Sequence, residues 1–353
     1  MPDHTTSKGL DRKPADAGSR PVAVFAMDPD KTRYVFTEEH MRRLSDLCQL
    51  PASRPLRGFD GRDAGRLLGD TEILITGWGC PRIDAAVLDR APRLRLIAHA
   101  AGSVKRIVGA EVFRRGISVC HAAAANALPV AEYTVAAVLL ANKRIGRFHH
   151  LYTTERGIND EMRSLADGPI GNYRKRIGIV GASRIGRRVI ELLQPFDLEL
   201  FVYDPWIEAA EARKLGAQTC DLPTVMGCDV VTLHAPLLET TKGMINADAL
   251  ARMPDGGTLI NTARGAIVDQ AALERELVSG RIDAVIDVTH PEILPPDSPL
   301  YRLPNVLITP HIAGAMGVER NRLGSLIVDQ IARFVSGRKL SHLVNPDLLD
   351  REA

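Results

Sequence analysis

The sequence has little of what marks the specialised protein classes. Its 353 residues include only five cysteines, an odd number without any Cys-x-x-Cys pair. This disfavours a disulfide framework or a zinc site and favours reduced thiols, so we expect no metal. No apolar run approaches the roughly 20 residues of a membrane span. The formal net charge is only +2, which gives no reason to propose nucleic acid or a membrane surface as a partner.

What remains is an ordinary globular composition, with 45% hydrophobic and 25% charged residues. The length is sufficient for two domains with sizeable cores. Residues 1–20 are polar and contain no apolar segment of the kind that a secretory signal needs. We interpret them as a disordered leader, and together with the reduced thiols they predict a cytoplasmic protein.

Short apolar runs alternate with helical patterns along the first region. Strands are predicted at 22–26, 73–76, 94–98 and 117–120, and a helix at 37–50 with Thr37 as its N-cap. A long apolar helix from 126 to about 147 then serves as a connector, and the polar, glycine-containing residues 148–172 are expected to be a surface excursion. A regular β-α series follows.

A helical tail at 318–337 lies beyond the last predicted strand and is expected to pack on the first domain. The first domain is then discontinuous, with a second domain inserted into it. We place the substrate-binding domain at 21–127 with 316–353, and the nucleotide-binding domain at 128–315.

A glycine-rich turn opens that second domain. The apolar run from Ile177 leads into Gly181-Ala182-Ser183-Arg184-Ile185-Gly186, and a helical pattern follows. This is nearly the dinucleotide fingerprint G-x-G-x-x-G, with Ser183 in place of the middle glycine. We expect NAD contacts from Gly181, Ser183, Arg184, Ile185 and Gly186, with the pyrophosphate at the helix N-terminus.

The next predicted strand, 198–203, ends at Asp204. This carboxylate lies 18 positions after Gly186, where an acidic residue that binds the ribose hydroxyls is expected. The order strand, glycine turn, helix, strand and acid is the context that the fingerprint requires. It therefore predicts NAD binding in spite of Ser183.

Functional side chains follow three more predicted strands near the C-terminal third. The segments 258–260, 284–286 and 306–308 precede Arg264, the pair Asp287 and Glu292, and His311, respectively. The carboxyl ends of parallel strands form the ligand edge of an open sheet, so we expect these side chains to gather there. A guanidinium, carboxylates and an imidazole suit a carboxylate-bearing substrate and the transfer of one proton.

Together these residues resemble the D-isomer-specific 2-hydroxyacid dehydrogenases, which act on substrates such as D-lactate, glyoxylate, hydroxypyruvate and 3-phosphoglycerate. The similarity extends from about residue 22 to 346 and includes the ordered set Arg264, Glu292 and His311. The resemblance implies two doubly wound parallel-sheet domains, a Rossmann NAD-binding domain inserted into a smaller flavodoxin-like substrate domain. It also implies a homodimer that uses NAD and a small 2-ketoacid or 2-hydroxyacid.

The resemblance also implies roles for individual residues. Arg264 would hold the substrate carboxylate, His311 would be the acid–base, and Glu292 would pair with it. Asp287 would reach the nicotinamide, or else serve only as a strand-end turn residue. Further cofactor contacts are expected from His234, Ala235, Pro236 and Thr262.

On the substrate side, the backbone amides of Ala101, Gly102 and Ser103 could form a nest for a carboxylate. Trp78 would line the substrate pocket, or else only pack. Lys105, His290 and Ile293 depart from the family's usual residues, and Gly77-Trp78-Gly79 lacks the arginine that phosphoglycerate-specific members often carry. These departures leave the particular hydroxyacid open.

Two alternatives to a hydroxyacid dehydrogenase are compatible with the same fold. One is a family member that acts on another small anion, such as formate or phosphite; the set Arg264, Glu292 and His311 argues against it. The other is a binding protein, similar to a corepressor, that uses the same fold to sense NADH. Turnover of any 2-ketoacid with NADH would separate an enzyme from a sensor.

Overall fold

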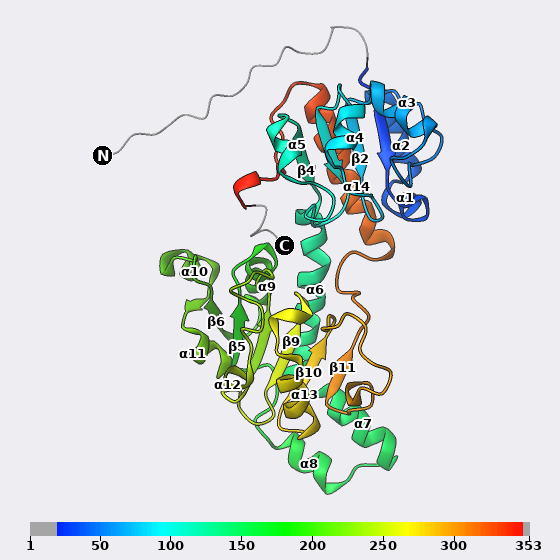
Figure 1. Ribbon diagram of the computed structural model, residues 1–353. Helices are drawn as coiled ribbons and strands as arrows, with labels where there is room; N and C mark the ends of the chain where they lie inside the picture. The colour runs from blue at the N-terminus through cyan, green and yellow to red at the C-terminus, as the bar shows by residue number, and fades with distance from the viewer. Residues whose placement is uncertain (1–19, 349–353) are drawn as a thin grey trace, which may run out of the picture. The chain divides into compact units, whose positions relative to one another are not determined.

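The computed structural model describes residues 20–348, which form two compact units (Figure 1). Unit 1 comprises the described chain through Ala122 and the segment Asn321–Pro346, whereas unit 2 comprises Ala123–Arg320 and the described residues from Asp347. The chain therefore leaves unit 1 once and returns to it. The leader predicted at 1–20 lies, apart from Arg20, outside the described residues.

Unit 1 is built on a parallel four-stranded sheet. Its elements are β1 (Ala23–Ala26), α1 (Pro29–Val35), α2 (Glu38–Leu47), α3 (Arg62–Asp70), β2 (Ile73–Thr76), α4 (Ala85–Arg90), β3 (Leu96–His99), α5 (Ala110–Arg114), β4 (Ser118–His121) and, from the C-terminal segment, α14 (Arg320–Val335). The strand order is β1-β2-β3-β4. Thr37 caps α2 as predicted, because its hydroxyl accepts a hydrogen bond from the His40 amide.

Isolated parallel bridges extend this sheet beyond β1. Val22 pairs with Gln49 and Ala26 with Leu56, so segment 49–56 borders β1 on the edge opposite β2. With this segment counted as the second strand, the order is that of a flavodoxin-like sheet. At the other edge, Cys120 of β4 pairs with Leu343 in the antiparallel direction. The returning segment thus completes unit 1.

Unit 2 carries the larger sheet. Its helices are α6 (Ala123–Asn142), α7 (Ile145–Glu155), α8 (Asp160–Ala166), α9 (Arg184–Leu193), α10 (Ala209–Leu215), α11 (Leu222–Met226), α12 (Ala247–Leu250) and α13 (Gln270–Val278). Its strands are β5 (Lys175–Val180), β6 (Leu198–Tyr203), β7 (Gln218–Thr219), β8 (Val230–Leu233), β9 (Thr258–Asn261), β10 (Asp283–Ile286) and β11 (Val306–Ile308). Short 3-10 turns occur at Gly265–Ile267, Pro299–Tyr301, Gly317–Glu319 and Pro346–Leu348.

All strands of this sheet are parallel, in the order β11-β10-β9-β8-β5-β6-β7. The direction of winding reverses between β5 and β8, which is the switch point where such sheets bind ligands. The predicted fold class is confirmed: a Rossmann domain is inserted into a smaller flavodoxin-like domain, and both are doubly wound. The strands at 198–203 and 306–308 begin and end where the sequence predicted.

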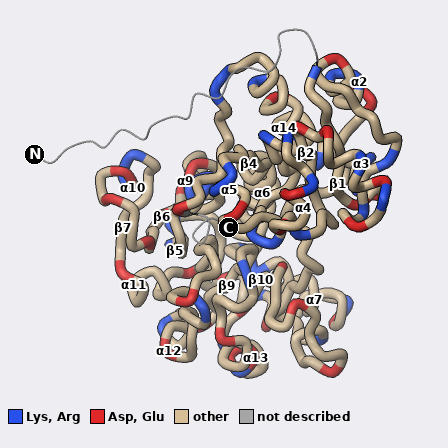
Figure 2. The backbone as a smooth tube through the Cα atoms, turned by 45° about the horizontal axis from the view of Figure 1, so that its top comes forward, with Lys and Arg blue, Asp and Glu red and all other residues tan. Residues whose placement is uncertain are grey.

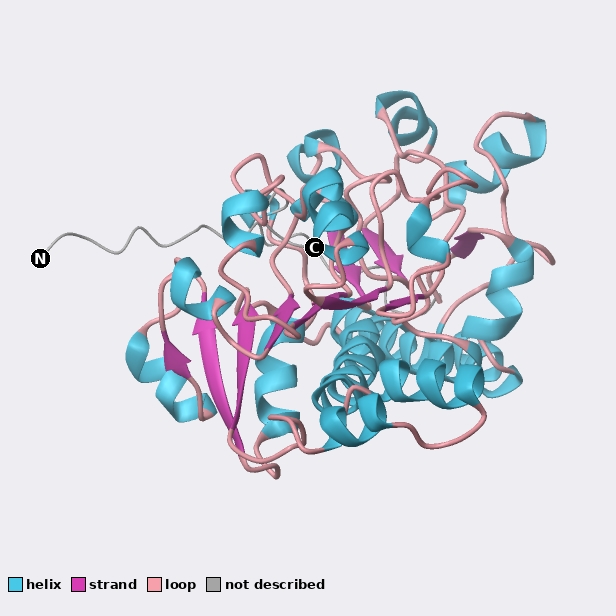
Figure 3. Ribbon diagram, turned by 90° about the horizontal axis from the view of Figure 1, so that it is seen from below, coloured by secondary structure: helices cyan, strands magenta, loops and turns pink. Residues whose placement is uncertain are grey.

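Helices cover both faces of the seven-stranded sheet (Figure 3), and each face has its own core. Successive strand residues alternate between them: Leu259 packs with α11, α12 and α13, whereas Ile260 packs with α6 and α9. Because both faces are buried there, the central strands β8, β9 and β10 are nearly continuous apolar runs in the sequence.

Helix α6 contradicts the expectation that no apolar run approaches the length of a membrane span. It has 20 residues and a mean hydropathy of 1.4 over its 18-residue window, so by length and composition alone it could cross a membrane. Ala131 and Val138 nevertheless have no exposed surface and belong to the core of unit 2. A helix that is apolar on most sides is also what a buried core position requires.

Two helices occupy most of the stretch predicted to be a surface excursion. The connector predicted to reach residue 147 ends at Asn142, where Arg144 adopts a left-handed φ of 50°, and α7 and α8 follow. None of the residues of α7 is buried. Its apolar residues Ile145, Phe148, Leu151 and Tyr152 recur at helical spacing, so the sequence contained a pattern for this helix although the stripe is not a core face.

Basic and acidic residues are interspersed over both units (Figure 2). This distribution agrees with the small net charge of +2 and with the many arginine–carboxylate pairs at the surface, such as Arg187 with Glu211 and Arg115 with Asp89.

Candidate active site

A histidine–glutamate pair lies past the carboxyl ends of β10 and β11. His311 Nδ1 is 2.5 Å from Glu292 Oε1, and the two side chains retain 52% and 62% of their exposure. An exposed pair of this kind contributes little to folding. Its effect is to fix the imidazole ring, which leaves Nε2 as the nitrogen able to exchange a proton with another molecule.

Asp287 holds the loop that carries His311. The carboxylate is 2% exposed and accepts hydrogen bonds from Thr309 Oγ1 at 2.6 Å, from the Ile312 amide at 2.7 Å and from the Ala313 amide at 3.0 Å. Its backbone carbonyl accepts the His311 amide at 2.9 Å. These contacts match the turn-residue alternative, and the nicotinamide contact stays a prediction.

Arg264 is exposed in a turn after β9 that Asn261 shapes. The buried Asn261 side chain accepts from the Ala263 amide at 3.0 Å and donates to the Arg264 carbonyl at 3.1 Å. The sequence analysis gave Asn261 no role of its own, although an Asn at a strand end is the usual residue for such a turn. The Arg264 guanidinium donates to the Ala263 carbonyl at 2.6 Å.

Gly265 brings this turn against the segment that leads to Glu292. A Cβ at Gly265 would lie 2.1 Å from the carbonyl of Thr289 and 2.6 Å from the amide nitrogen of His290. Only glycine permits this approach, because real Cβ atoms do not come within 3.0 Å of backbone. The Arg264 turn and the segment preceding Glu292 are therefore packed together.

The glycine turn lies at the switch point between β5 and β8. Gly181 has a φ of 100°, and a Cβ there would lie 2.5 Å from the Ala235 amide nitrogen. A Cβ at Gly186 would lie 2.0 Å from the Gly181 carbonyl oxygen. Both glycines are thus required for the strand, the turn and α9 to fit together, as the fingerprint predicts.

Ser183 replaces the middle glycine without backbone strain. Its φ of −65° is accessible to any residue, and its hydroxyl caps α9 by accepting from the Gly186 amide at 3.4 Å. Arg184 and Ile185 are the first two residues of the helix. The cradle therefore retains the geometry of a dinucleotide site, and the serine satisfies one amide at its helix N-terminus.

Asp204 ties the end of β6 to the same turn. Its carboxylate accepts from the Ala182 amide at 2.6 Å and from the Trp206 amide at 2.8 Å. A carboxylate has about four lone-pair positions, so two further hydrogen bonds from ribose hydroxyls can be accepted.

The residues predicted after β8 and β9 are largely enclosed. His234 is 3% exposed, its Nε2 is 3.0 Å from Thr232 Oγ1, and burial lowers its pKa to about 3, so it is neutral. Its Nδ1 has no hydrogen-bond partner among the described residues. Ala235 is buried against Gly181, and Pro236 is half-buried. The buried Thr262 hydroxyl lies 3.2 Å from that of Thr134.

The predicted substrate residues follow two strands of unit 1. Ala101 is buried, Gly102 is half-buried and Ser103 is exposed, all directly after β3. Trp78 is half-buried after β2, and its carbonyl accepts the Asp28 amide at 2.8 Å. They belong to a different unit from His311, and each set stands at the carboxyl edge of its own sheet.

His99 organises this edge and was missed by the sequence analysis. Its Nδ1 is 2.9 Å from Thr76 Oγ1, and its ring also hydrogen-bonds the backbone of Ser103. Burial, followed by the charge of neighbouring His121, lowers the pKa of His99 to about 3. A neutral, fully enclosed histidine thus links β2 to the loop of Ala101, Gly102 and Ser103.

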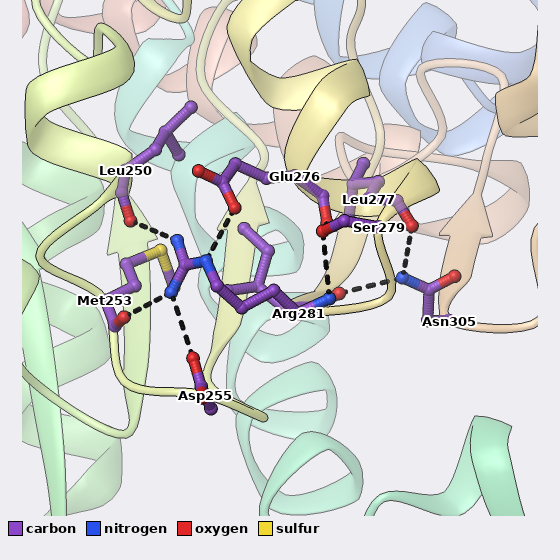
Figure 4. Close-up of polar contacts among 9 residues, drawn as sticks. Leu250, Met253, Asp255, Glu276, Leu277, Ser279, Arg281 and Asn305 are labelled. Atoms are coloured by element: carbon purple, nitrogen blue, oxygen red, sulfur yellow. Dashed lines mark hydrogen bonds and ion pairs between the residues drawn. The ribbon is translucent and has the colours of Figure 1, made fainter.

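A cavity of about 710 Å³ lies elsewhere, at the amino ends of β5, β8 and β9. Its charged groups pair with one another, as Lys175 does with Asp229 at 2.7 Å. Arg281 at its rim donates to Glu276 and to the carbonyls of Leu250 and Met253, which closes the end of α12 (Figure 4). The cavity is at the opposite edge of the sheet from Gly181 and His311, so it is not the candidate active site.

Within residues 20–348, no group of three or more histidine, cysteine, aspartate or glutamate side chains is arranged to hold a metal ion.

Residues 135–313 match the family model for the D-isomer specific 2-hydroxyacid dehydrogenase NAD-binding domain, over half of the chain. The chain belongs to this family. The cofactor is accordingly NAD, and Gly181, Gly186 and Asp204 lie inside the matched segment.

Family relatives fall into more than one activity class. A glyoxylate reductase from Korarchaeum cryptofilum is 32% identical over 274 residues, covering 76% of this chain and 81% of the relative. A D-3-phosphoglycerate dehydrogenase from Archaeoglobus fulgidus is 30% identical over 266 residues, covering 75% and 50%. The chain thus spans about half the length of that dehydrogenase. The structure of an Aquifex aeolicus D-lactate dehydrogenase with NAD and lactic acid superposes with a TM-score of 0.65, at 25% identity, covering 89% of this chain and 96% of that one.

Proposed function

We propose that this chain is an NAD-dependent D-2-hydroxyacid dehydrogenase that transfers a hydride between nicotinamide and C2 of a small 2-ketoacid or 2-hydroxyacid. The observation that carries the proposal is the pairing of His311 with Glu292, 2.5 Å apart, at the carboxyl edge of an NAD-binding sheet. An acid–base held by a carboxylate is what interconversion of a ketone and an alcohol needs in addition to the cofactor.

NAD supplies the hydride chemistry, and the protein supplies binding, orientation and the proton. The cramped turn of Gly181 and Gly186 would hold the pyrophosphate at the start of α9, and Asp204 would accept the ribose hydroxyls. Ser183, Arg184, Ile185, His234, Ala235, Pro236 and Thr262 complete the proposed cofactor contacts.

During reduction of the ketone, His311 donates a proton from Nε2 to the carbonyl oxygen of the substrate while hydride reaches C2. Glu292 accepts the hydrogen bond of Nδ1 and stabilises the charged ring before this transfer. In the oxidative direction, neutral His311 accepts the proton from the hydroxyl.

Arg264 binds the substrate carboxylate in this proposal. Its planar guanidinium can donate two parallel hydrogen bonds to a carboxylate, which fixes the substrate's orientation as well as its position. The proposal also assigns substrate contacts to Ala101, Gly102, Ser103 and Trp78. Small and medium 2-ketoacids are the preferred class, because Gly77-Trp78-Gly79 offers no arginine for a phosphate.

The test is NADH oxidation by the purified protein with glyoxylate, hydroxypyruvate, pyruvate, phenylpyruvate and phosphohydroxypyruvate. Turnover of one or more unphosphorylated ketoacids is expected, and it should be lost in His311→Ala. NADH binding without turnover of any member of the panel would favour an NADH-sensing protein instead. A clear preference for phosphohydroxypyruvate would overturn the substrate class while leaving the chemistry.

The proposal includes a cytoplasmic homodimer. Five free cysteines suit a reducing compartment. Helix α7 offers a surface for the second copy, because none of its residues is buried and its large apolar side chains Ile145 and Tyr152 are 45% and 57% exposed. Sedimentation or light scattering should give twice the chain mass of 38.5 kDa.

A further inference from the structure

The backbone of His311 is held in a conformation that a non-glycine residue rarely adopts. Its φ is 55°, in the left-handed region, where Cβ crowds the backbone. Such a conformation persists only where the surroundings fix it. The loop of residues 309–315 must therefore be held on both sides of His311.

Asp287 accepts hydrogen bonds from this loop, and a second element, helix α6, also contacts it. The Tyr133 hydroxyl, from α6, is 2.9 Å from Thr309 Oγ1, and Thr309 Oγ1 is 2.6 Å from Asp287 Oδ1. The Asp287 carboxylate can only accept, so Thr309 donates to it and accepts from Tyr133. The direction of the chain Tyr133 to Thr309 to Asp287 is fixed.

Helix α6 touches the loop again beyond His311. Asn126 Oδ1 accepts from the Ala315 amide at 3.1 Å, and a Cβ at Gly314 would lie 3.5 Å from the same oxygen. Asn126 and Tyr133 are seven residues apart, two turns of helix, and so project from one face. One face of α6 thus holds the loop on both sides of the histidine.

We propose that Tyr133, supported by Asn126, is a positioning residue for His311. It acts through Thr309 and Asp287 and makes no contact with the reacting atoms. The proposal rests on His311 being the proton donor. The Tyr133 phenol remains protonated and able to donate, because burial raises its pKa. Without the hydroxyl, the loop loses a hydrogen bond that keeps the imidazole at its working position.

The experiment compares Tyr133→Phe with the parent enzyme on the best ketoacid of the panel. Removal of one neutral hydrogen bond should lower kcat about 3- to 10-fold. The KM for NADH should not change, since the glycine turn is untouched. Tyr173→Phe is the matched control: this tyrosine is 67% exposed and outside the site, and its kcat should equal that of the parent.

The decisive measurement repeats Tyr133→Phe in the His311→Ala background. If Tyr133 acts through His311, the double variant should turn over at the rate of His311→Ala alone. An equal fold-loss in both backgrounds would overturn the positioning role. A parental kcat for Tyr133→Phe, together with an inactive His311→Ala, would also overturn the positioning role. The proposed function would still stand after this outcome.

A second pair of variants guards against misfolding of Tyr133→Phe. Thr309→Val breaks the same chain at its centre, and Thr309→Ser restores the hydroxyl. Loss of kcat in the valine variant and recovery in the serine variant are expected. Equal activities of the two would contradict the proposal. If His311→Ala itself kept the parental kcat, both the positioning role and the acid–base assignment would fall.

Discussion

Glu292 and His311 show how a weak contact can matter for chemistry. Both side chains are more than half exposed, so solvent screens their attraction and the pair adds little to the stability of unit 2. What the contact provides is a defined ring orientation. The functional cost of losing either residue should therefore exceed the structural cost.

His311→Ala should lower kcat by about 10²–10⁴-fold, the usual range for a lost general acid–base, with a much smaller change in the KM of the ketoacid. Steady-state rates with saturating NADH measure both. The midpoint of urea unfolding should stay near that of the parent. A near-parental kcat would remove the catalytic assignment.

Glu292→Gln should lower kcat by less than His311→Ala does. The amide oxygen of glutamine can still accept the hydrogen bond of His311 Nδ1 and keep the ring oriented, but it carries no charge. Steady-state rates with saturating NADH measure the difference.

Asp297→Asn is the control for that variant, because it removes a charge from the same loop without touching His311. It should keep the parental kcat. An equal loss of kcat in the two variants would mean that the net charge of the loop, and not the contact with His311, is what matters.

Asp204 should make the enzyme prefer NADH to NADPH by at least about tenfold in kcat/KM, or roughly 1.4 kcal/mol. The carboxylate would repel a 2′-phosphate, and the next residues, Pro205 and Trp206, include no arginine to receive one. Parallel kinetics with the two cofactors test this, and Asp204→Ser should narrow the ratio. Equal kcat/KM values would contradict the assignment of Asp204.

At the scale of elements, the junction of β5 with α9 depends on the absence of a side chain. Gly186→Ala would place a Cβ 2.0 Å from the Gly181 carbonyl oxygen, so helix and strand must separate. We expect a loss of about 1–3 kcal/mol in unfolding free energy, as for an overpacked core, and weaker NADH binding by fluorescence titration.

Ser183→Gly is the matched control in the same turn. It restores the usual fingerprint glycine and removes only the helix cap, which should cost a few tenths of a kcal/mol. NADH affinity near the parental value is expected. If Ser183→Gly weakened NADH binding as much as Gly186→Ala did, the close packing of Gly186 would not explain the loss of affinity in Gly186→Ala.

The elements that the sequence located are those whose burial left a pattern. Strands β6 and β11 were bounded correctly, and β9 and β10 within one residue. Burial on both faces explains the apolar runs of β9 and β10, whereas β6 and β11 are only partly buried. Helices α7 and α8 were missed. In α7 apolar residues recur at helical spacing, but none of them is buried, and the surrounding polar and glycine residues favoured an irregular reading.

The candidate site was predictable to the extent that strand ends could be located. Arg264, Glu292 and His311 were identified because they follow predicted strands. The contacts that hold them could not be found in this way, since Tyr133 is 178 positions from His311 and its partner, Thr309, was only part of a motif. The role of His99 was likewise hidden, because it depends on Thr76 in a neighbouring strand.

At the scale of the whole molecule, each unit encloses a neutral histidine. Burial lowers the pKa of His99 in unit 1 and of His234 in unit 2 to about 3. In the unfolded chain a histidine takes up a proton below about pH 6.5. Between these values the unfolded state binds more protons, so stability rises with pH and is lost as pH falls from about 6.5 toward 3.

The unfolding free energy should therefore be lower at pH 5.5 than at pH 7.5, by about 1 kcal/mol for each of these histidines. Urea unfolding at the two pH values tests this. His234→Gln, which does not titrate, should show a smaller difference between the two pH values than the parent. A parent equally stable at both values would show that these rings are not held neutral.

The insertion of unit 2 into unit 1 has a consequence for how the chain is made. All strands of unit 2 and its helices α6 to α13 lie within Ala123–Arg320, so they are synthesised before the segment Asn321–Pro346 of unit 1. Unit 1 begins first but at that moment still lacks α14 and the segment whose Val344 amide bonds to the Val119 carbonyl of β4. Domains usually mature in the order in which they are synthesised. Here the sheet of the nucleotide-binding unit can form before β1 to β4 gain their contacts with Asn321–Pro346.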